Sequence, residues 1–308
     1  MTSTVTTSPA NTPLARADAT TRELRPRYEG ANIGTWIGFK HVNYLIEEAV
    51  LDHLARHGYP AGALYERHGL CVELVTMDTK IRTALHVDDV VTAIVEPVPG
   101  TDTELDFHVS LRVRRDSVVR AASARVGVRL RRDRRGGSVA PAPTGLEQYT
   151  VDSLWSGGDH RRTAGDNSFT WRFRVPYFYC HFTERLQLSG YLRLLEETVD
   201  RFLADRGVSI RTLLDERNWI PVVPRSRVEV LDEALIEEDL YIVFTVDEVF
   251  KRLTYTATMD CFVVRDGVEV PTATASITHG YALIGSRRDW GVVDFDDRLR
   301  NALMQPGR

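Results

Sequence analysis

Apolar residues recur at helical spacing in two stretches that lie far apart in the chain. Within His41–Gly58, aliphatic residues fall at positions 42, 45, 46, 49, 50 and 54, which share one face of a helix. Gly190–Gly207 repeats this pattern 149 residues later, and each stretch ends on a glycine suited to the left-handed C-cap of a helix. The same offset superimposes the acidic pair Glu47–Glu48 on Glu196–Glu197. We therefore expect two equivalent, largely buried helices with glutamates at the same place.

Segments that alternate between apolar and polar residues follow each of the two helices. A period of two predicts strands with one buried face, and the short polar breaks between the segments suit hairpin turns. The predicted strands are Asp88–Val98, Ala122–Leu130, Glu238–Val249 and Leu253–Val263, with turns at Arg114–Ser117 and Arg265–Val268. Each half of the chain therefore has the element order β-α-β-β-β-β. This order predicts the α+β class, with an antiparallel sheet wrapped around a helix in each half.

Shorter similarities extend the repeat beyond the helices. Leu64–Leu70 matches Leu214–Ile220 at an offset of 150 residues, and Asp89 matches Asp239 at the same offset. A register kept over most of both halves indicates a tandem duplication. We predict an unstructured N-terminus over residues 1–21, a first repeat over 22–132, a polar linker rich in glycine and proline over 133–169, a second repeat over 170–284 and a tail over 285–308, in which Asp294–Gln305 forms a short helix.

Composition narrows the classes of protein and of site. The chain has 308 residues and a formal net charge of −4, which excludes a globally basic nucleic-acid binder. Its three cysteines (Cys71, Cys180 and Cys261) lie far apart without a CxxC motif, so we expect neither a metal site nor a disulfide framework. No run approaches the roughly 20 apolar residues of a membrane span, and the N-terminus lacks the apolar core of a secretory signal. We expect a cytoplasmic protein without a membrane anchor.

The second helix carries the string YLRLLEE at Tyr191–Glu197. In this order of elements the string resembles the hotdog superfamily, and in particular its 4-hydroxybenzoyl-CoA thioesterase-like group, whose helix commonly reads YLRxxEEA. The resemblance covers both repeats and implies a double hotdog, in which one chain imitates the usual dimer. It also implies hydrolysis of acyl-CoA or acyl-carrier-protein thioesters at a site between the two hotdogs, without a metal or an organic cofactor.

Two departures from the family's motifs bear on the mechanism. Many such thioesterases have an aspartate in a DTDxxGHVNN loop before the helix, whereas the second repeat has Cys180 near that place. Hotdog dehydratases have a histidine some fourteen residues before a glutamate, and His181 lies fifteen residues before Glu196. A dehydratase or hydratase acting on 3-hydroxyacyl or enoyl thioesters is therefore the alternative to a thioesterase. A non-catalytic acyl-binding protein is the third hypothesis.

Four residues are candidates for catalysis. Glu47 and Glu196 occupy the position where related thioesterases place a carboxylate that acts as base or nucleophile, and burial would raise its pKa. Both glutamates could instead form the solvated edge of an amphipathic helix. His181 could polarise a thioester carbonyl or abstract a proton, and His41 lies near the start of the first helix. Either histidine could instead be structural.

Residues before the helices are the candidates for substrate binding. Asn32 and Thr35 lie in the loop before the first helix and can donate hydrogen bonds to a carbonyl, although such residues often serve only the loop itself. Gly38 and Gly190 lie near the two helix starts, where unpaired amide groups form a natural oxyanion site. Differences between the copies favour one working site. We predict a thioesterase that acts on acyl-CoA or an acyl carrier protein; acyl chain, carrier and assembly into oligomers are left open.

Overall fold

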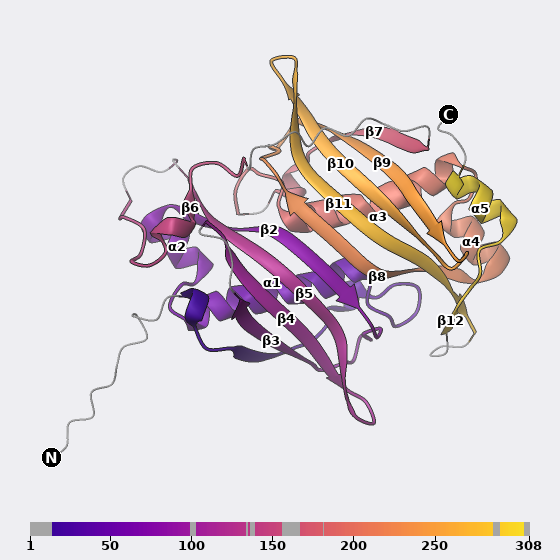
Figure 1. Cartoon of the computed structure of the whole chain (residues 1–308), viewed down its shortest axis with the longest axis horizontal. Coiled ribbons are helices and arrows are strands. Elements are labelled where there is room, and N and C mark those ends of the chain that lie inside the picture. Colours follow the sequence, from indigo (N-terminus) through magenta and orange to yellow (C-terminus); the bar gives the residue numbers. More distant parts are fainter. Residues whose placement is uncertain are drawn as a thin grey trace.

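Each half of the chain folds into one long helix, one short helix and a set of long strands (Figure 1). The computed structural model describes residues 14–98, 103–133, 135, 139–155, 167–180, 182–285 and 290–304. In the first half the elements are β1 (Thr20–Leu24), α1 (Phe39–Arg56), α2 (Ala61–His68), β2 (Leu70–Ile81), β3 (Val91–Val98), β4 (Leu105–Arg114), β5 (Val118–Arg132) and β6 (Thr150–Val151). In the second half they are β7 (Ser168–Arg174), α3 (Leu188–Asp205), α4 (Ile210–Arg217), β8 (Trp219–Val230), β9 (Asp239–Phe250), β10 (Thr254–Arg265), β11 (Val268–Ile284), β12 (Trp290–Val292) and α5 (Asp297–Met304). The predicted order β-α-β-β-β-β is confirmed in both halves.

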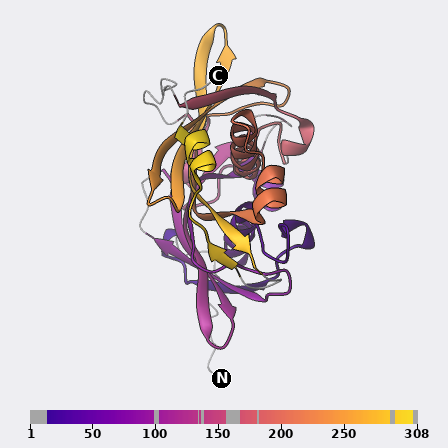
Figure 2. The ribbon, with the colours of Figure 1, turned by 90° about the vertical axis from the view of Figure 1, so that its right-hand side faces the viewer.

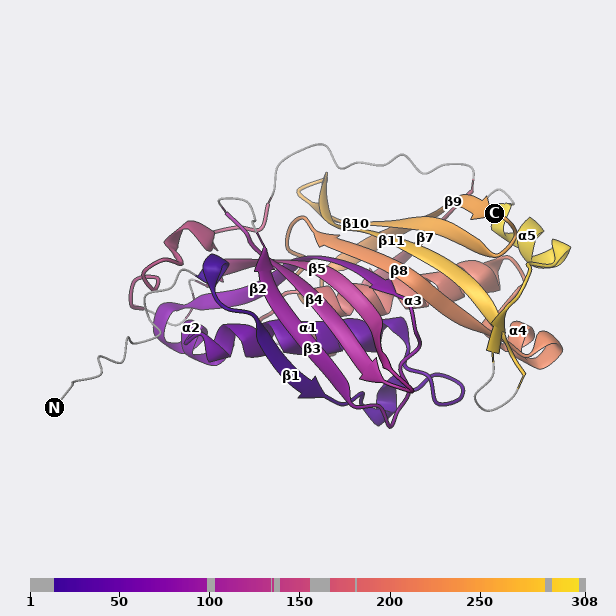
Figure 3. The ribbon, with the colours of Figure 1, turned by 60° about the horizontal axis from the view of Figure 1, so that its bottom comes forward.

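The strands of both repeats join into one sheet. Among the described residues it has twelve strands, with β1-β3-β4-β5-β2-β8-β11-β10-β9-β7 as its continuous path (Figure 3). Neighbours on this path are antiparallel; β12 also pairs antiparallel with β11, and β6 pairs parallel with β5. The predicted α+β class and antiparallel sheet are therefore confirmed. The chain reverses the strand order of the first repeat in the second, which is the arrangement of two halves related by a two-fold axis.

Strands β2 and β8 join the two halves. Thr76–Lys80 pairs with Arg225–Glu229, and in this register Asp78 lies opposite Arg227, its own counterpart 149 residues later. A position paired with its own counterpart marks the approximate two-fold axis, as in a self-complementary dimer interface. The Asp78 carboxylate accepts two hydrogen bonds from the guanidinium of Arg225, at 2.7 and 3.1 Å. One chain therefore forms internally what two chains form in a symmetric dimer.

The two long helices lie next to each other on one side of the sheet (Figure 2). The apolar faces expected from the sequence are buried, with Ile46 and Val50 of α1 matched by Leu195 and Val199 of α3, each at most 2% exposed. Burial of one such side chain contributes about 1.5–3 kcal/mol to stability. The strands therefore wrap around a core that both helices share.

Both predicted glycine C-caps are confirmed. Gly58 and Gly207 have φ of +95° and +72°, and the residue after each glycine donates its amide to the carbonyl five residues back, at 2.9 Å. This is a Schellman motif, which fixes the end of a helix. The helices begin two residues earlier than predicted, at Phe39 and Leu188, because these buried apolar residues join the first turn.

The internal offset of 150 residues predicted after the helices is wrong. Helices α2 and α4, and strands β2 and β8, keep the offset of 149, and Gly69 and Asn218 both end their short helix in the left-handed conformation. Asp89 corresponds to Glu238 rather than to Asp239. Each of these two carboxylates accepts two hydrogen bonds from an arginine after the hairpin strand, Asp89 from Arg115 and Glu238 from Arg265.

The described termini and linker are more ordered than expected. The expected unstructured segment ran to residue 21, but Leu14 is buried in a 3₁₀ turn and β1 already begins at Thr20; residues 1–13 lie outside the described chain. Within the predicted linker, Tyr149 and Leu154 are buried against the core because they are large apolar residues. The terminal helix expected within 294–305 is present as α5.

Candidate functional site

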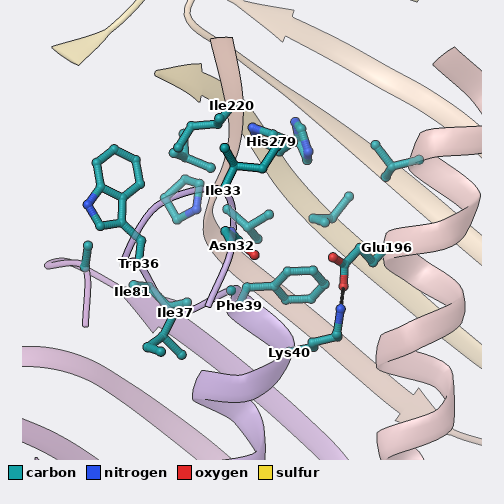
Figure 4. Close-up of a pocket in the computed structure, with 18 of the residues that line it drawn as sticks. Asn32, Ile33, Trp36, Ile37, Phe39, Lys40, Ile81, Glu196, Ile220 and His279 are labelled. Carbon is teal, nitrogen blue, oxygen red and sulfur yellow. Dashed lines mark hydrogen bonds and ion pairs between the residues drawn. The ribbon is translucent and has the colours of Figure 1, made fainter. Parts of the chain in front are cut away.

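A cavity of about 670 Å³ lies at the junction of the two repeats (Figure 4). The first repeat contributes the loop before α1, the start of α1 and the end of β2. The second repeat contributes α3, β8 and β11. The volume falls within the roughly 300–1,000 Å³ of typical small-molecule sites. We call this place the apolar junction.

Aliphatic and aromatic side chains form most of its wall. Trp36 and Ile220, from opposite repeats, pack against each other with Ala282 in a small cluster separate from the main core. Phe39, at the first turn of α1, and Val199 of α3 continue the wall toward the helices. The wall suits an apolar chain, since contact with it removes apolar surface from water.

Two carboxylates of α3 meet one lysine of α1 at the side of the cavity. Glu196 forms an ion pair with Lys40 across the junction (Figure 4). Asp200, one helical turn further along α3, lines the same cavity. Desolvation by the surrounding protein, followed by repulsion from Glu196, raises the pKa of Asp200 to about 7, while Lys40 opposes the shift. A carboxylate with this pKa can take and return a proton near neutral pH.

The start of α1 points hydrogen-bond donors at the same cavity. The amides of Phe39 and Lys40 are the first two of the helix, so they have no acceptor within it. The Gly38 amide is already used, because it donates to the Gly30 carbonyl at 2.9 Å. A Cβ on Gly38 would lie 2.8 Å from Oδ1 of Asn32, so only glycine lets the Asn32 amide group approach the helix start this closely. The helix dipole adds positive potential at this end.

A polar hollow of about 470 Å³ adjoins the cavity and shares Lys40, Glu196 and Asp200 with it. Its remaining lining includes Tyr44 and Arg193, which are counterparts in the two repeats and touch each other across the axis. The Tyr44 hydroxyl accepts a hydrogen bond from Nε of Arg193 at 2.9 Å. The hollow therefore offers cations and hydroxyls next to the apolar cavity.

The predicted site residues fall into four groups. Glu196, Asn32 and Gly38 line the cavity. His41 lines the polar hollow instead, where burial and then Lys40 lower its pKa. The two residues away from the cavity are Thr35, whose hydroxyl is hydrogen-bonded to the ring of His86 at 2.9 Å, and Gly190, which is packed against Leu186. Gly190 therefore makes room for a side chain and not, as expected, for a thioester oxygen. His181 lies outside the described residues.

Glu47 occupies the position of Glu196 at the opposite junction. Burial, and then the charge of Glu48, raises its pKa to about 7, while Arg193 opposes the shift. Ser189 stands there in place of Lys40, so Glu47 has no counterpart of the Lys40–Glu196 ion pair.

The opposite junction differs in chemistry from the apolar one. At the positions of Trp36 and Val222 it has Arg185 and Glu73, which form a buried ion pair at 2.6 Å. Beside this pair, Arg131 and Glu233 form a second ion pair at the positions of Ala282 and Ala84. We call this place the charged junction.

Several residues of the apolar junction were missed from the sequence. Lys40 and Asp200 are charged residues of a helix and look like its solvated face, and Trp36 looks like an isolated loop aromatic. His279 of β11 lines the cavity from the sheet side (Figure 4). The one available signal was in β11, where a histidine interrupts an otherwise apolar alternation.

The comparisons with known proteins bear on the fold. No model of a protein family matches the sequence, and no curated protein resembles it significantly. Among solved structures, a protein described as an oleoyl thioesterase from Lactobacillus plantarum is 14% identical with a TM-score of 0.61, over 87% of this chain and 97% of its own. A 12:0-ACP thioesterase from Umbellularia californica is 10% identical with a TM-score of 0.59, over 85% and 94%. An acyl-ACP thioesterase from Bacteroides thetaiotaomicron is 10% identical with a TM-score of 0.57, over 85% and 97%.

Two further searches concern the described residues only. Within them, no helix has the length and apolar character needed to cross a membrane. No group of three or more metal-binding side chains lies together in the same part of the chain. The matches to solved structures extend over nearly their whole length and over both repeats of this chain. The chain therefore has the double hotdog fold, with its two copies in tandem.

Proposed function

We propose that the protein hydrolyses the thioester of an acyl group carried by coenzyme A or by an acyl carrier protein. One observation carries the proposal: the apolar cavity, the unpaired amides of α1 and the carboxylates of α3 meet at the same junction. A thioester needs these three features together, namely a wall for its acyl chain, donors for its carbonyl oxygen and a base for water.

The carbonyl oxygen would lie at the start of α1. The amides of Phe39 and Lys40 and the side-chain amide of Asn32 would donate hydrogen bonds to it. These donors stabilise the negative charge that the oxygen gains when water attacks the carbonyl carbon. The acyl chain would extend along Trp36 and Ile220.

Asp200 would act as the general base. Its ionised carboxylate takes a proton from water as the C–O bond forms, and a tetrahedral intermediate results. When the C–S bond breaks, Asp200 returns the proton to the departing thiolate, so that carboxylic acid and thiol leave with all atoms balanced. Glu196, held by Lys40, would position this base and sustain its raised pKa.

The carrier would approach through the polar hollow. Lys40 and Arg193 offer positive charge there, which attracts phosphate groups. The printed names of the structural neighbours describe oleoyl and acyl-ACP thioesterases, and the present proposal is of the same class. We place the activity in the cytoplasm, because Cys71, Cys180 and Cys261 are buried free thiols that suit a reducing compartment.

The test is thiol release from a panel of acyl-CoA and acyl-carrier-protein thioesters of increasing chain length. Asp200→Asn should reduce kcat about 10²–10⁴-fold, the usual contribution of a general base. Glu196→Gln should reduce it less, and Glu47→Gln, the matched control at the charged junction, should leave it within about threefold. Saturable binding of acyl thioesters without release by the wild-type protein would show an acyl-binding protein instead. Formation of enoyl products from 3-hydroxyacyl thioesters would show a dehydratase.

A further inference from the structure

We infer that the apolar junction selects acyl chains that carry an oxygen substituent, a hydroxyl or a keto group, and that His279 binds this oxygen. The inference rests on the proposed function for the identity of the carrier thioester. It concerns the far wall of the cavity, formed by the sheet, and not the reacting carbonyl.

His279 is a buried polar residue that faces the cavity. Only 3% of its surface is exposed, and it lines the cavity together with Ile220 and Ile277 (Figure 4). Its Nδ1 is buried without a hydrogen-bond partner among the described residues. Since buried polar atoms are nearly always paired, an unpaired ring at a cavity wall indicates a ligand that pairs with it.

The ring of His279 is held by two tyrosines. The ring centroids of Tyr255 and Tyr281 both lie 5.1 Å from that of His279. Burial lowers the pKa of His279 to about 3, so the imidazole is neutral at physiological pH. A neutral imidazole has one donor nitrogen and one acceptor nitrogen, and therefore suits a hydroxyl or a carbonyl oxygen better than a carboxylate.

The first repeat shows that this polar wall is not required by the fold. Strand pairing identifies the counterparts: Leu130 lies opposite Val72 as Tyr281 lies opposite Pro221, and Leu105 lies opposite Val128 as Tyr255 lies opposite His279. The three polar residues of the second repeat thus replace Leu105, Val128 and Leu130 of the first. All three replacements occur in the repeat whose sheet faces the cavity.

Position along α3 links this wall to the catalytic side. The negative charge of Asp200 adds to burial in raising the pKa of Tyr281 and of Tyr255. Both hydroxyls are fully buried and stay protonated, so they can donate. The polar wall therefore lies close to the proposed base, and an oxygen bound by His279 would belong to the acyl chain and not to the carrier.

The test measures binding without hydrolysis, by isothermal titration of acyl-pantetheine thioethers matched in length. One of each pair is unsubstituted, and the other carries a hydroxyl or keto group at successive chain positions. The wild-type protein should bind one oxygenated member roughly tenfold more tightly, the effect of a well-formed hydrogen bond to a buried group. His279→Val, which copies Val128 of the first repeat, should remove this preference, and His279→Gln should keep part of it.

Thermal unfolding of each variant provides the structural control. Because His279→Val removes an unpaired polar group from the interior, its Tm should equal or exceed that of the wild type. Equal affinity of the wild type for every matched pair would overturn the inference, as would a preference that survives in His279→Val. Hydrolysis is scored separately: release of thiol without preference contradicts only the inference, and a preference in binding without release contradicts only the proposed function.

Discussion

The two junctions between the repeats have the same backbone arrangement and opposite side-chain chemistry. Three positions that surround the cavity at the apolar junction are Trp36, Ile220 and Val222, and the same three at the charged junction are Arg185, Cys71 and Glu73. In a symmetric dimer every such change would appear at both places. Tandem duplication removes this constraint, so one junction can bind a substrate while the other serves the stability of the pseudo-dimer.

The charged junction has its own energetic consequence. Arg185 is 2% exposed, and burial raises the pKa of Glu73 even though Arg185 opposes the shift. A buried ion pair of this kind adds little net stability over well-packed apolar residues, but loss of one partner leaves an unpaired charge in the interior. The two junctions should therefore respond very differently to single and to paired substitutions.

The largest expected effect is the loss of one charge at the charged junction. Arg185→Leu should lower the free energy of unfolding by about 3–5 kcal/mol, because Glu73 would remain buried without its partner. The double variant Arg185→Trp with Glu73→Val copies the apolar junction and should recover most of this loss. Urea denaturation of the three proteins at neutral pH measures both effects. Equal destabilisation by the single and the double variant would contradict the account of the pair.

The fold was predictable because its signals are local and are repeated. The glycines Gly58 and Gly207, the apolar faces of α1 and α3 and the alternation along the strands each specify their element without reference to the rest of the chain. The offset of 150 residues failed for the opposite reason. Similar letters such as Asp89 and Asp239 outweighed a register that depends on β-bulges in the second repeat, which local similarity does not reveal.

The candidate site was only partly predictable. Glu196, Asn32 and Gly38 were found because they lie next to a helix with a recognisable pattern. Asp200 and His279 were missed, since their roles depend on which repeat faces the cavity. That choice is made by side chains from the other half of the chain, and no spacing along either repeat encodes it.

The next effect concerns the pH dependence of the apolar junction. If Asp200 is the base, kcat/KM should rise roughly tenfold from about pH 6 to pH 8, because the ionised fraction of a group with a pKa of about 7 rises by this factor. Lys40→Ser copies Ser189 of the charged junction and removes a charge that lowers the pKa of Asp200, so the midpoint should move to higher pH. A profile of initial rates for both proteins measures this shift. A midpoint that does not move would exclude Asp200 as the titrating group.

The smallest effect, and the sharpest test of the asymmetry, is that of Glu47→Gln. The pKa of Glu47 is about 7 in the folded protein against 4.5 when unperturbed. The folded state therefore binds more protons between these values, and stability falls as the pH rises through this window. Above about pH 7 the wild type bears the full cost of an ionised Glu47, which the glutamine lacks. We expect Glu47→Gln to raise the free energy of unfolding by about 1 kcal/mol at pH 8 and to leave it unchanged near pH 4.

The same variant should retain thiol release within about threefold, since the proposed chemistry takes place at the other junction. Denaturation curves at the two pH values and one steady-state assay decide the matter. A stability gain with unchanged activity assigns the charged junction to the structure of the pseudo-dimer. A loss of activity by about tenfold or more would mean that Glu47 takes part in catalysis, so that both junctions work in spite of their different walls.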